Sequence, residues 1–207
     1  MTLTQVKYLP YLLFHPFDGF FEARFRGKGS IWLATLLLVI YGLTQIASVQ
    51  YTGFIINYRH LYGLESGELF LSGVIPVIAF VISNWSVTTL MNGNGRFRDI
   101  YMVVCYALAP LVIFSLISIL LSNVMVLDEM IILNAIGHLG TIWFCFLVFS
   151  GLCVVHEYTA ARNIAALLAT AIAAMVLLFI IVLYLTLMDT VRGFLEVIYI
   201  ELQKRWW

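Results

Sequence analysis

Apolar residues in this chain fall into five long windows that contain no Asp, Glu, Lys or Arg. Each window is 26 to 30 residues long, and a helix needs about 20 apolar residues to cross the hydrocarbon core of a bilayer. Each window therefore predicts one membrane-spanning helix. The expected spans cover residues 31–51, 69–90, 100–121, 131–155 and 164–187. The predicted fold is an all-α polytopic membrane protein, a bundle of five transmembrane helices with amphipathic interfacial helices at both ends.

The N-terminal segment, residues 1–29, is amphipathic. His15-Pro16 marks the start of a helix, because Pro is favoured at the first helical position, and Gly27 marks its end. Four aromatic residues are expected on one face at i, i+3, i+4 and i+8, namely Phe17, Phe20, Phe21 and Phe25. Two placements stay open: the helix lies flat among the lipid headgroups, or it packs on the protein's own spans.

The C-terminal tail, residues 189–207, predicts a second amphipathic helix. Its apolar residues recur with helical spacing at Val191, Phe194, Leu195, Ile198 and Leu202. Trp favours the membrane–water boundary, and the chain ends in Trp206-Trp207, so we expect the tail to lie along the membrane surface. The chain then divides into the segment 1–29, a transmembrane domain 30–188 and the tail 189–207.

Composition supports membrane insertion and excludes several classes of protein. The chain is 63% hydrophobic and 11% charged, whereas a soluble domain carries about 25% charged residues. The expected environment is therefore a lipid bilayer. The formal net charge is zero, and proteins that bind DNA or RNA present a basic face, so no nucleic acid partner is expected.

The distribution of Lys and Arg predicts the orientation. Seven of these cations lie on the side of the N-terminus: Lys7, Arg24, Arg26, Lys28, Arg96, Arg98 and Arg162. Four lie on the other side: Arg59, Arg192, Lys204 and Arg205. Because cytoplasmic loops carry the excess of Lys and Arg, we expect a multi-pass protein of the cytoplasmic (inner) membrane with its N-terminus cytoplasmic and its C-terminus outside.

Polar side chains inside the spans form a candidate intramembrane cluster. Its members are Gln45, Asn84, Thr88 and His138. Gln45, Asn84 and Thr88 either make hydrogen bonds between helices or line a polar cavity open to the cytoplasm. His138 either makes such a hydrogen bond or marks a proton path.

The chain shows no pattern of residues suited to catalysis. His156-Glu157 begins like the HExxH zinc motif, but position 160 is Ala where the motif requires His. Cys105, Cys145 and Cys153 form no CxxC pair, which favours a packing role. No catalytic, cofactor-binding or metal-ligating residue is expected. We expect no enzymatic activity, since acid–base and nucleophilic catalysis need paired groups.

Two features suit contact with a partner. The turn between the second and third spans is rich in Gly and Asn, and its candidate contact residues are Asn92, Gly93, Gly95, Arg96, Phe97 and Asp99. The fifth span has small residues at i+4 spacing, namely Ala161, Ala165, Ala169 and Ala173. Small residues let helix backbones approach closely, so this face packs either on the chain's own bundle or on another protein.

Short sequence phrases recur in a distinctive order along nearly the whole chain. They are His15-Pro16, Gly27-Lys28-Gly29-Ser30, Asn84-Trp85, Thr88-Thr89-Leu90, Gly93-Asn94-Gly95, Phe97-Arg98-Asp99-Ile100 and Tyr106-Ala107-Leu108-Ala109-Pro110. In order and spacing they resemble the bacterial branch of the Yip family, the Ypt/Rab-interacting-protein-like membrane domain. The resemblance implies a five-span membrane adaptor. The family has no catalytic residues, so the resemblance implies none for this chain.

The resemblance also bears on partners. Eukaryotic relatives engage small GTPases and shape or sort vesicle membranes, but this chain lacks their long polar N-terminal region, so no small GTPase is expected. Some bacterial members occur beside ABC-type exporters. The leading hypothesis is a non-enzymatic accessory or scaffold protein with ABC transporter subunits as candidate partners. The alternative is a small channel or carrier for a neutral solute or lipid, because facilitated passage does not require charged residues.

Overall fold

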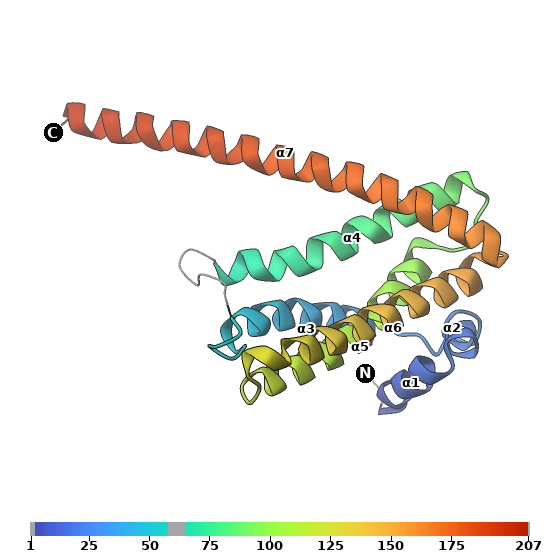
Figure 1. Ribbon diagram of the computed structural model, residues 1–207. Coiled ribbons are helices and arrows are strands. Elements are labelled where there is room, and N and C mark those ends of the chain that lie inside the picture. Colours follow the sequence, from blue (N-terminus) through green and yellow to red (C-terminus); the bar gives the residue numbers. More distant parts are fainter. Residues whose placement is uncertain (1–2, 58–64, 207) are drawn as a thin grey trace.

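The computed structural model describes residues 3–57 and 65–206, and all regular structure in these ranges is helical (Figure 1). The elements are α1 (Leu3–Phe14), α2 (Pro16–Phe25), α3 (Ile31–Gln50), α4 (Ser66–Leu90), α5 (Phe97–Ser122), η1 (Leu127–Glu129), α6 (Met130–His156) and α7 (Ala160–Trp206). Five of these segments are long and apolar enough to cross a membrane. The predicted all-α fold with five spans is confirmed, and α3 to α6 agree with the expected ranges within three residues at each end. Arg59 and Trp207, used above for orientation and tail placement, lie outside the described residues.

The spanning helices alternate in direction, so the connections gather at two ends of the bundle. Residues 26–30, 91–96 and 157–159 meet at one end, on the right of Figure 1, which we call the loop end. At the opposite end, the Gly53 N–H donates to Ser122 Oγ over 2.9 Å, and the Asn123 side chain donates to the Tyr51 carbonyl over 3.0 Å. These bonds tie the end of α3 to the end of α5.

Helix α5 occupies the centre of the bundle and contacts α3, α4 and α6. Every residue from Met102 to Pro110 is buried, which requires neighbours on all sides of the helix. Inside a bilayer the hydrophobic effect does not draw helices together, so close backbone approach at small residues takes its place. Gly151 of α6 is one such position, because a Cβ there would lie 2.5 Å from Val103 Cγ1 of α5.

Of the two placements left open for the N-terminal segment, the structure has the second: its helices α1 and α2 pack on the protein's own spans. Phe20 is 1% exposed and joins Tyr8, Leu12 and Ala23 in the core, and α2 contacts α6. The expected single aromatic face is wrong. Phe20 belongs with Pro16, Gly19 and Ala23 on the buried face of α2. The outer face carries the aromatic residues at i, i+4 and i+8, namely Phe17, Phe21 and Phe25, which are each about half exposed.

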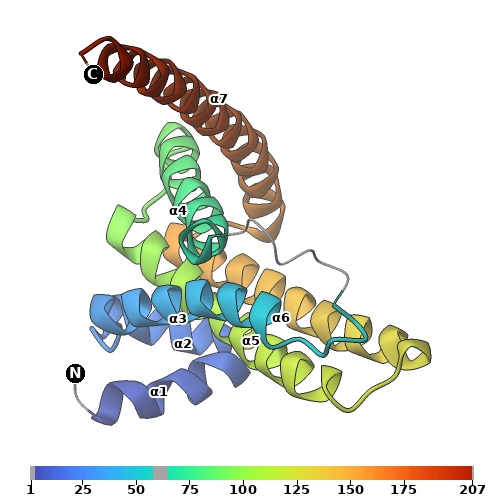
Figure 2. The same ribbon diagram turned by 90° about the vertical axis from the view of Figure 1, so that its left-hand side faces the viewer.

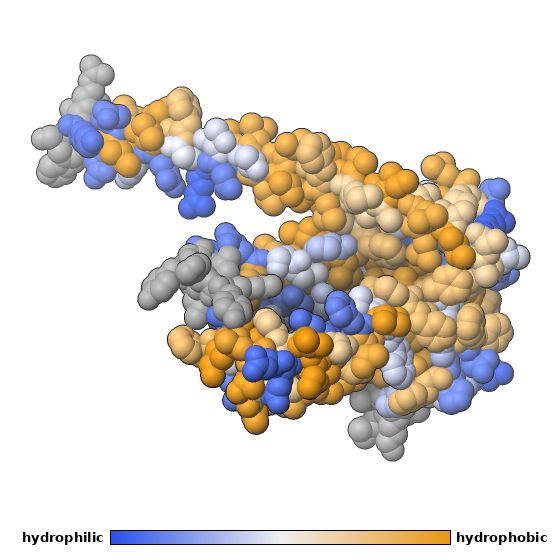
Figure 3. Space-filling view, in the orientation of Figure 1, coloured by the Kyte–Doolittle hydropathy of each residue, from blue (hydrophilic) through white to orange (hydrophobic). Residues whose placement is uncertain are grey.

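Helices α4 and α7 pair with each other and lean away from the other helices (Figure 2). Helix α7 is 47 residues long without a break, or about 70 Å at 1.5 Å per residue. The tail is therefore helical, as expected, and it continues the fifth span as one unbroken helix. Apolar surface covers much of α7 and of the body, and hydrophilic residues gather toward the outer part of α7 (Figure 3).

Candidate functional site

The α4–α5 turn at the loop end is held against the α6–α7 turn by two glycines. The Gly93 N–H donates to the Thr88 carbonyl over 2.8 Å, and the Gly95 N–H donates to His156 Nδ1 over 3.3 Å. A Cβ on Gly93 would lie 2.6 Å from His156 Nδ1, and a Cβ on Gly95 would lie 2.6 Å from His156 Cε1. Since such distances are too short for real Cβ contacts, only glycine lets the turn lie against the imidazole.

His156 connects three spanning helices through a chain of hydrogen bonds. The ring is 2% exposed, and because Nδ1 accepts the Gly95 N–H, the proton of the neutral ring lies on Nε2. Nε2 lies 3.4 Å from Asn84 Oδ1, and Asn84 Nδ2 donates to Thr170 Oγ1 over 3.0 Å. The Thr170 hydroxyl donates to the Ala166 carbonyl over 2.7 Å. This series of hydrogen bonds joins α6, α4 and α7, so these polar groups hold the helices to one another.

The structure assembles only part of the polar cluster proposed from sequence. Asn84 and Thr88 are both buried, and the Thr88 hydroxyl donates to the Asn84 carbonyl over 2.6 Å. Gln45 lies against Gly73, eleven residues before Asn84 on α4. His138 is exposed on α6. The side chain of Asn84 instead bonds His156 and Thr170, which were not among the residues predicted for the cluster.

Tyr158 and Arg162 hold the carbonyl of Met91 at the end of α4. Tyr158 Oη donates to that carbonyl over 3.1 Å, and Arg162 also donates to it. The Arg162 guanidinium lies 4.5 Å above the Tyr158 ring, a cation–π contact. Burial raises the pKa of the Tyr158 phenol, so it stays a neutral donor at physiological pH. The start of α7 is thus attached to the end of α4.

Arg24 of α2 binds both turns of the loop end. It donates to the Val155 carbonyl and, over 2.8 Å, to the Asn94 carbonyl. Because the last four carbonyls of a helix lack intrahelical partners, the guanidinium supplies donors to the end of α6. Its Nε lies 3.9 Å from Asp99 Oδ2, and both side chains are 14% exposed. In the sequence, Arg24 counts only toward the excess of positive charge on the N-terminal side, and no local pattern indicates this role.

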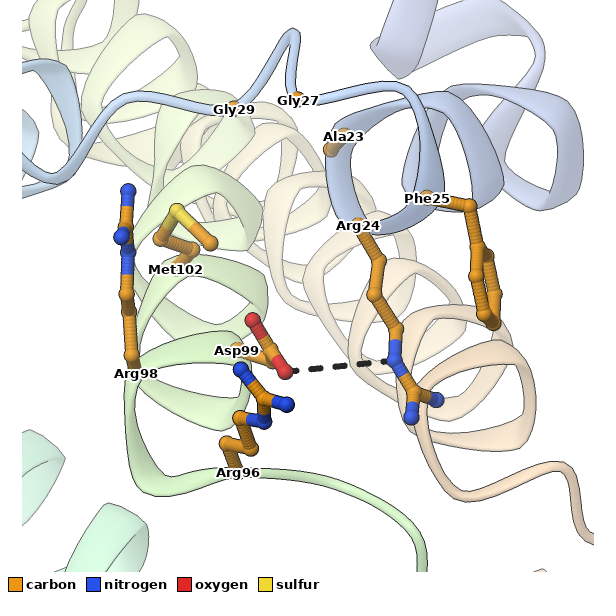
Figure 4. Close-up of a pocket in the computed structure, with 9 residues that line it drawn as sticks. All are labelled: Ala23, Arg24, Phe25, Gly27, Gly29, Arg96, Arg98, Asp99 and Met102. Atoms are coloured by element: carbon orange, nitrogen blue, oxygen red, sulfur yellow. Dashed lines mark ion pairs between the residues drawn. The ribbon is translucent and has the colours of Figure 1, made fainter.

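A basic pocket of about 410 Å³ opens beside Arg24, between α2 and the first turn of α5 (Figure 4). It is lined by Ala23, Arg24, Phe25, Gly27, Gly29, Arg96, Arg98, Asp99 and Met102. Three of the residues proposed as partner contacts, Asn92, Arg96 and Phe97, have exposed side chains. The Asp99 carboxylate points toward Arg24, and the two glycines Gly93 and Gly95 face the imidazole of His156.

A second cavity, also about 410 Å³, lies within the spans and is almost entirely apolar. It separates α4 from α5 and α6. Its lining includes Pro76, Val77 and Phe80 of α4, Leu108 and Leu111 of α5, and Phe144 of α6. This cavity does not touch Asn84, so the polar strip of span two does not line it.

The face of α7 that packs on α4 differs from the one expected. Its buried positions are Asn163, Ala166, Thr170 and Ala174, and Asn163 donates to the Phe149 carbonyl of α6 over 2.9 Å. Of the expected residues, Ala161 and Ala165 are exposed, and Ala169 and Ala173 are half-buried at the edge. Within the chain's own bundle the alanine row therefore lies at or outside the edge of the packing face, and its contact with another protein stays a prediction. Asn163 and Thr170 bond Phe149 and Asn84 of the bundle. The face of α7 that carries these two polar residues is therefore the one that points inward.

Across residues 3–57 and 65–206, no group of three or more His, Cys, Asp or Glu side chains could hold a metal ion.

The fold and the loop end define a multi-pass helical membrane protein whose N-terminal segment and turns are tied together by polar contacts. Residues 11–183 match the model of the Yip1 domain, so the chain belongs to the Yip1 family. The comparison with curated proteins and the comparison with solved structures each found no match.

Proposed function

We propose that the chain is a non-enzymatic accessory or scaffold protein of a bacterial cytoplasmic membrane, which holds a second membrane protein along α7. A subunit of an ABC-type transporter is the partner that the family resemblance favours. The proposal takes the loop end as cytoplasmic, following the excess of Lys and Arg there.

The length and exposure of α7 carry the proposal. From Ala160 to Met188 the helix has 29 residues, or about 43 Å, which already exceeds the bilayer core of about 30 Å. The 18 residues from Asp189 to Trp206 extend about 27 Å further. Lipid covers an apolar face inside the membrane, but an apolar face outside it needs another protein surface.

The apolar residues along this extension follow the spacing of a paired helix. Alternate steps of three and four residues connect Ile181, Tyr184, Met188, Val191, Leu195, Ile198 and Leu202. This spacing places them on one seam, as in the a and d positions of a coiled coil. From Tyr184 onward each is at least 39% exposed. Arg192 and Glu196 form an ion pair of 3.3 Å beside the seam. The surface therefore fits one helix of a partner protein.

Site-specific photo-crosslinking in the native membrane tests this proposal. A photoreactive residue at Leu195, on the seam, is expected to capture one partner of defined mass. The same residue at Ile200, on the opposite side of the same helix and 47% exposed, is the matched control and should capture much less. The captured species is then identified by mass spectrometry, and Leu195→Asp should abolish its co-purification while Ile200→Asp retains it.

Three outcomes would contradict the scaffold proposal. Equal capture at the two positions shows that α7 has no preferred face. Absence of capture at Leu195 shows that the seam is unoccupied. Capture of a second copy of this chain alone shows that the seam serves self-association and not a different membrane protein.

The apolar cavity favours a second candidate function, passage of a neutral solute or a lipid. Val77 lines this cavity, whereas Ile78 next to it on α4 is 39% exposed on the outside of the bundle. If molecules pass through the cavity, Val77→Trp should block glycerol flux or lipid scrambling in liposomes, and Ile78→Trp should not. Equal rates for wild type, both variants and protein-free liposomes would remove this candidate.

A further inference from the structure

The basic pocket beside Arg24 has a strong excess of positive charge. Arg24 reaches into it from α2, and Arg96 and Arg98 reach into it from the start of α5 (Figure 4). Asp99 is the one carboxylate among the lining residues, which leaves an excess of two positive charges. A pocket with this balance attracts an anion.

The three arginines of the pocket differ in whether the protein itself already binds their guanidinium groups. Arg24 is held by the Val155 and Asn94 carbonyls and faces Asp99. Arg96 and Arg98 are exposed, and within the described part of the chain neither guanidinium has an ion pair. Their five N–H donors each are therefore available to a ligand, and the guanidinium geometry suits the oxygens of a phosphate group.

The opposite wall of the pocket leaves the backbone accessible at Gly27. Gly27 has φ of +65°, and nothing lies within 4 Å of the place where a Cβ would stand. Gly29, the second glycine of this wall, is closely packed, and its N–H donates to the Ala23 carbonyl over 3.3 Å. The pocket also lies beside the first turn of α5, a helix of 26 residues, where free N–H groups and the helix dipole favour negative charge.

The pocket lies at the level expected for lipid headgroups. Gly29 lies two residues before the start of α3, and Arg96 lies directly before the start of α5, where the apolar spans begin. Aromatic residues typical of the membrane boundary surround this level. Trp32 is 81% exposed, and the rings of Trp85 and Phe97 lie 5.9 Å apart edge to face.

We propose that this pocket binds a phosphate group, and that the phosphate belongs to the headgroup of an anionic lipid. Arg96 and Arg98 are the ligand-binding cations, Arg24 shapes the pocket, and Asp99 limits its affinity for anions. A volume of about 410 Å³ falls within the usual range for small-ligand pockets, roughly 300 to 1,000 Å³. Basic pockets between membrane helices are a recognised way to hold such headgroups.

Binding is measured on the full chain in detergent, by native mass spectrometry with added phosphatidylglycerol, with phosphatidylcholine, or with glycerol 3-phosphate as the soluble source. The wild-type protein is expected to retain phosphatidylglycerol in preference to phosphatidylcholine. Arg96→Gln and Arg98→Gln should each weaken this binding by about tenfold or more, since each removes a charge-assisted hydrogen bond. Arg26→Gln is the matched control, because it lies outside the pocket and pairs with Glu22 at 2.9 Å.

Asp99→Asn gives a test that damage to the fold could not imitate, because it should tighten the binding of phosphatidylglycerol. Soluble glycerol 3-phosphate that binds as tightly as phosphatidylglycerol would overturn the assignment to a lipid. Equal retention of the two lipids, or equal effects of Arg96→Gln, Arg98→Gln and Arg26→Gln, would overturn the site itself. These variants lie far from Leu195, so failure here is distinct from failure of the scaffold proposal.

Discussion

Replacing Arg24 with Gln tests whether one side chain of the N-terminal segment holds the loop end together. The variant loses the hydrogen bonds to the Val155 and Asn94 carbonyls and the contact with Asp99. A control variant, Arg26→Gln, removes an equal charge from the same segment. Arg26 is 64% exposed and pairs with Glu22 alone.

The expected loss of stability follows from the contacts of Arg24. Two hydrogen bonds from a charged donor contribute about 1.5 kcal/mol each at the lower end of their range, or about 3 kcal/mol together. The contact with Glu157 at 3.6 Å adds nothing to this sum, because Glu157 is 53% exposed and water screens the pair. For Arg26→Gln we expect less than about 0.5 kcal/mol, as for other surface ion pairs.

Thermal unfolding in detergent measures the difference. Cys105 is buried, whereas Cys145 is exposed and Cys153 half-buried, so in a Cys145→Ser, Cys153→Ser background a thiol-reactive dye reports the opening of the core around α5. A loss of about 3 kcal/mol corresponds to a fall in Tm of roughly 6–12 °C for a chain of this size. If Arg24→Gln and Arg26→Gln lower Tm equally, the two carbonyl contacts do not stabilise the loop end and the reasoning is refuted.

Three further predictions concern the same end of the molecule. Gly95→Ala should cost about 1–3 kcal/mol because its Cβ meets His156, whereas Gly67→Ala has nothing within 4 Å and should be tolerated; equal Tm values would contradict this. Asn84→Leu leaves the His156 Nε2–H without its acceptor and should cost about 1–3 kcal/mol, while Ser86→Leu, on the exposed side, should not change Tm in the same assay. The Lys28 ammonium, and then Arg26, hold the pKa of Glu22 below its ordinary value of 4.5. The stability that these contacts give is therefore present above pH 4.5 and is lost as the pH falls through the lower pKa of the folded state. Lys28→Ala should raise the Glu22 pKa in a carbon-13 NMR titration, and an unchanged value would refute the contact.

The spans could be predicted from sequence because charged residues are costly inside a bilayer, so the charge-free windows mark the membrane directly. The end of α7 could not be predicted from the same signal. Asp189 ends the apolar window, but a charge ends a membrane span without ending a helix. The nearest glycine, Gly193, is tolerated inside α7 and does not break it.

Side-chain partners were harder to predict, because they depend on how each helix is rotated and how deep it lies. Asn84 is near the end of the second span and His156 at the end of the fourth, so alternating directions place them at the same level. His138 lies in the first third of α6, 18 residues before His156, and is exposed. On α7, too, rotation decides which residues are buried: these are Ala166 and Thr170, each one position after a member of the alanine row.

The unbroken length of α7 has a mechanical consequence. Its first turn is fixed by Tyr158, Arg162 and Asn163 at the loop end, and its last residues lie about 70 Å further along the helix. A tilt of about 5° at the base of such a rod displaces its tip by about 6 Å, comparable to one helical turn. Helix α7 therefore has the geometry of a lever arm, because a movement at its base too small to break the contacts of His156 displaces its tip by about one helical turn.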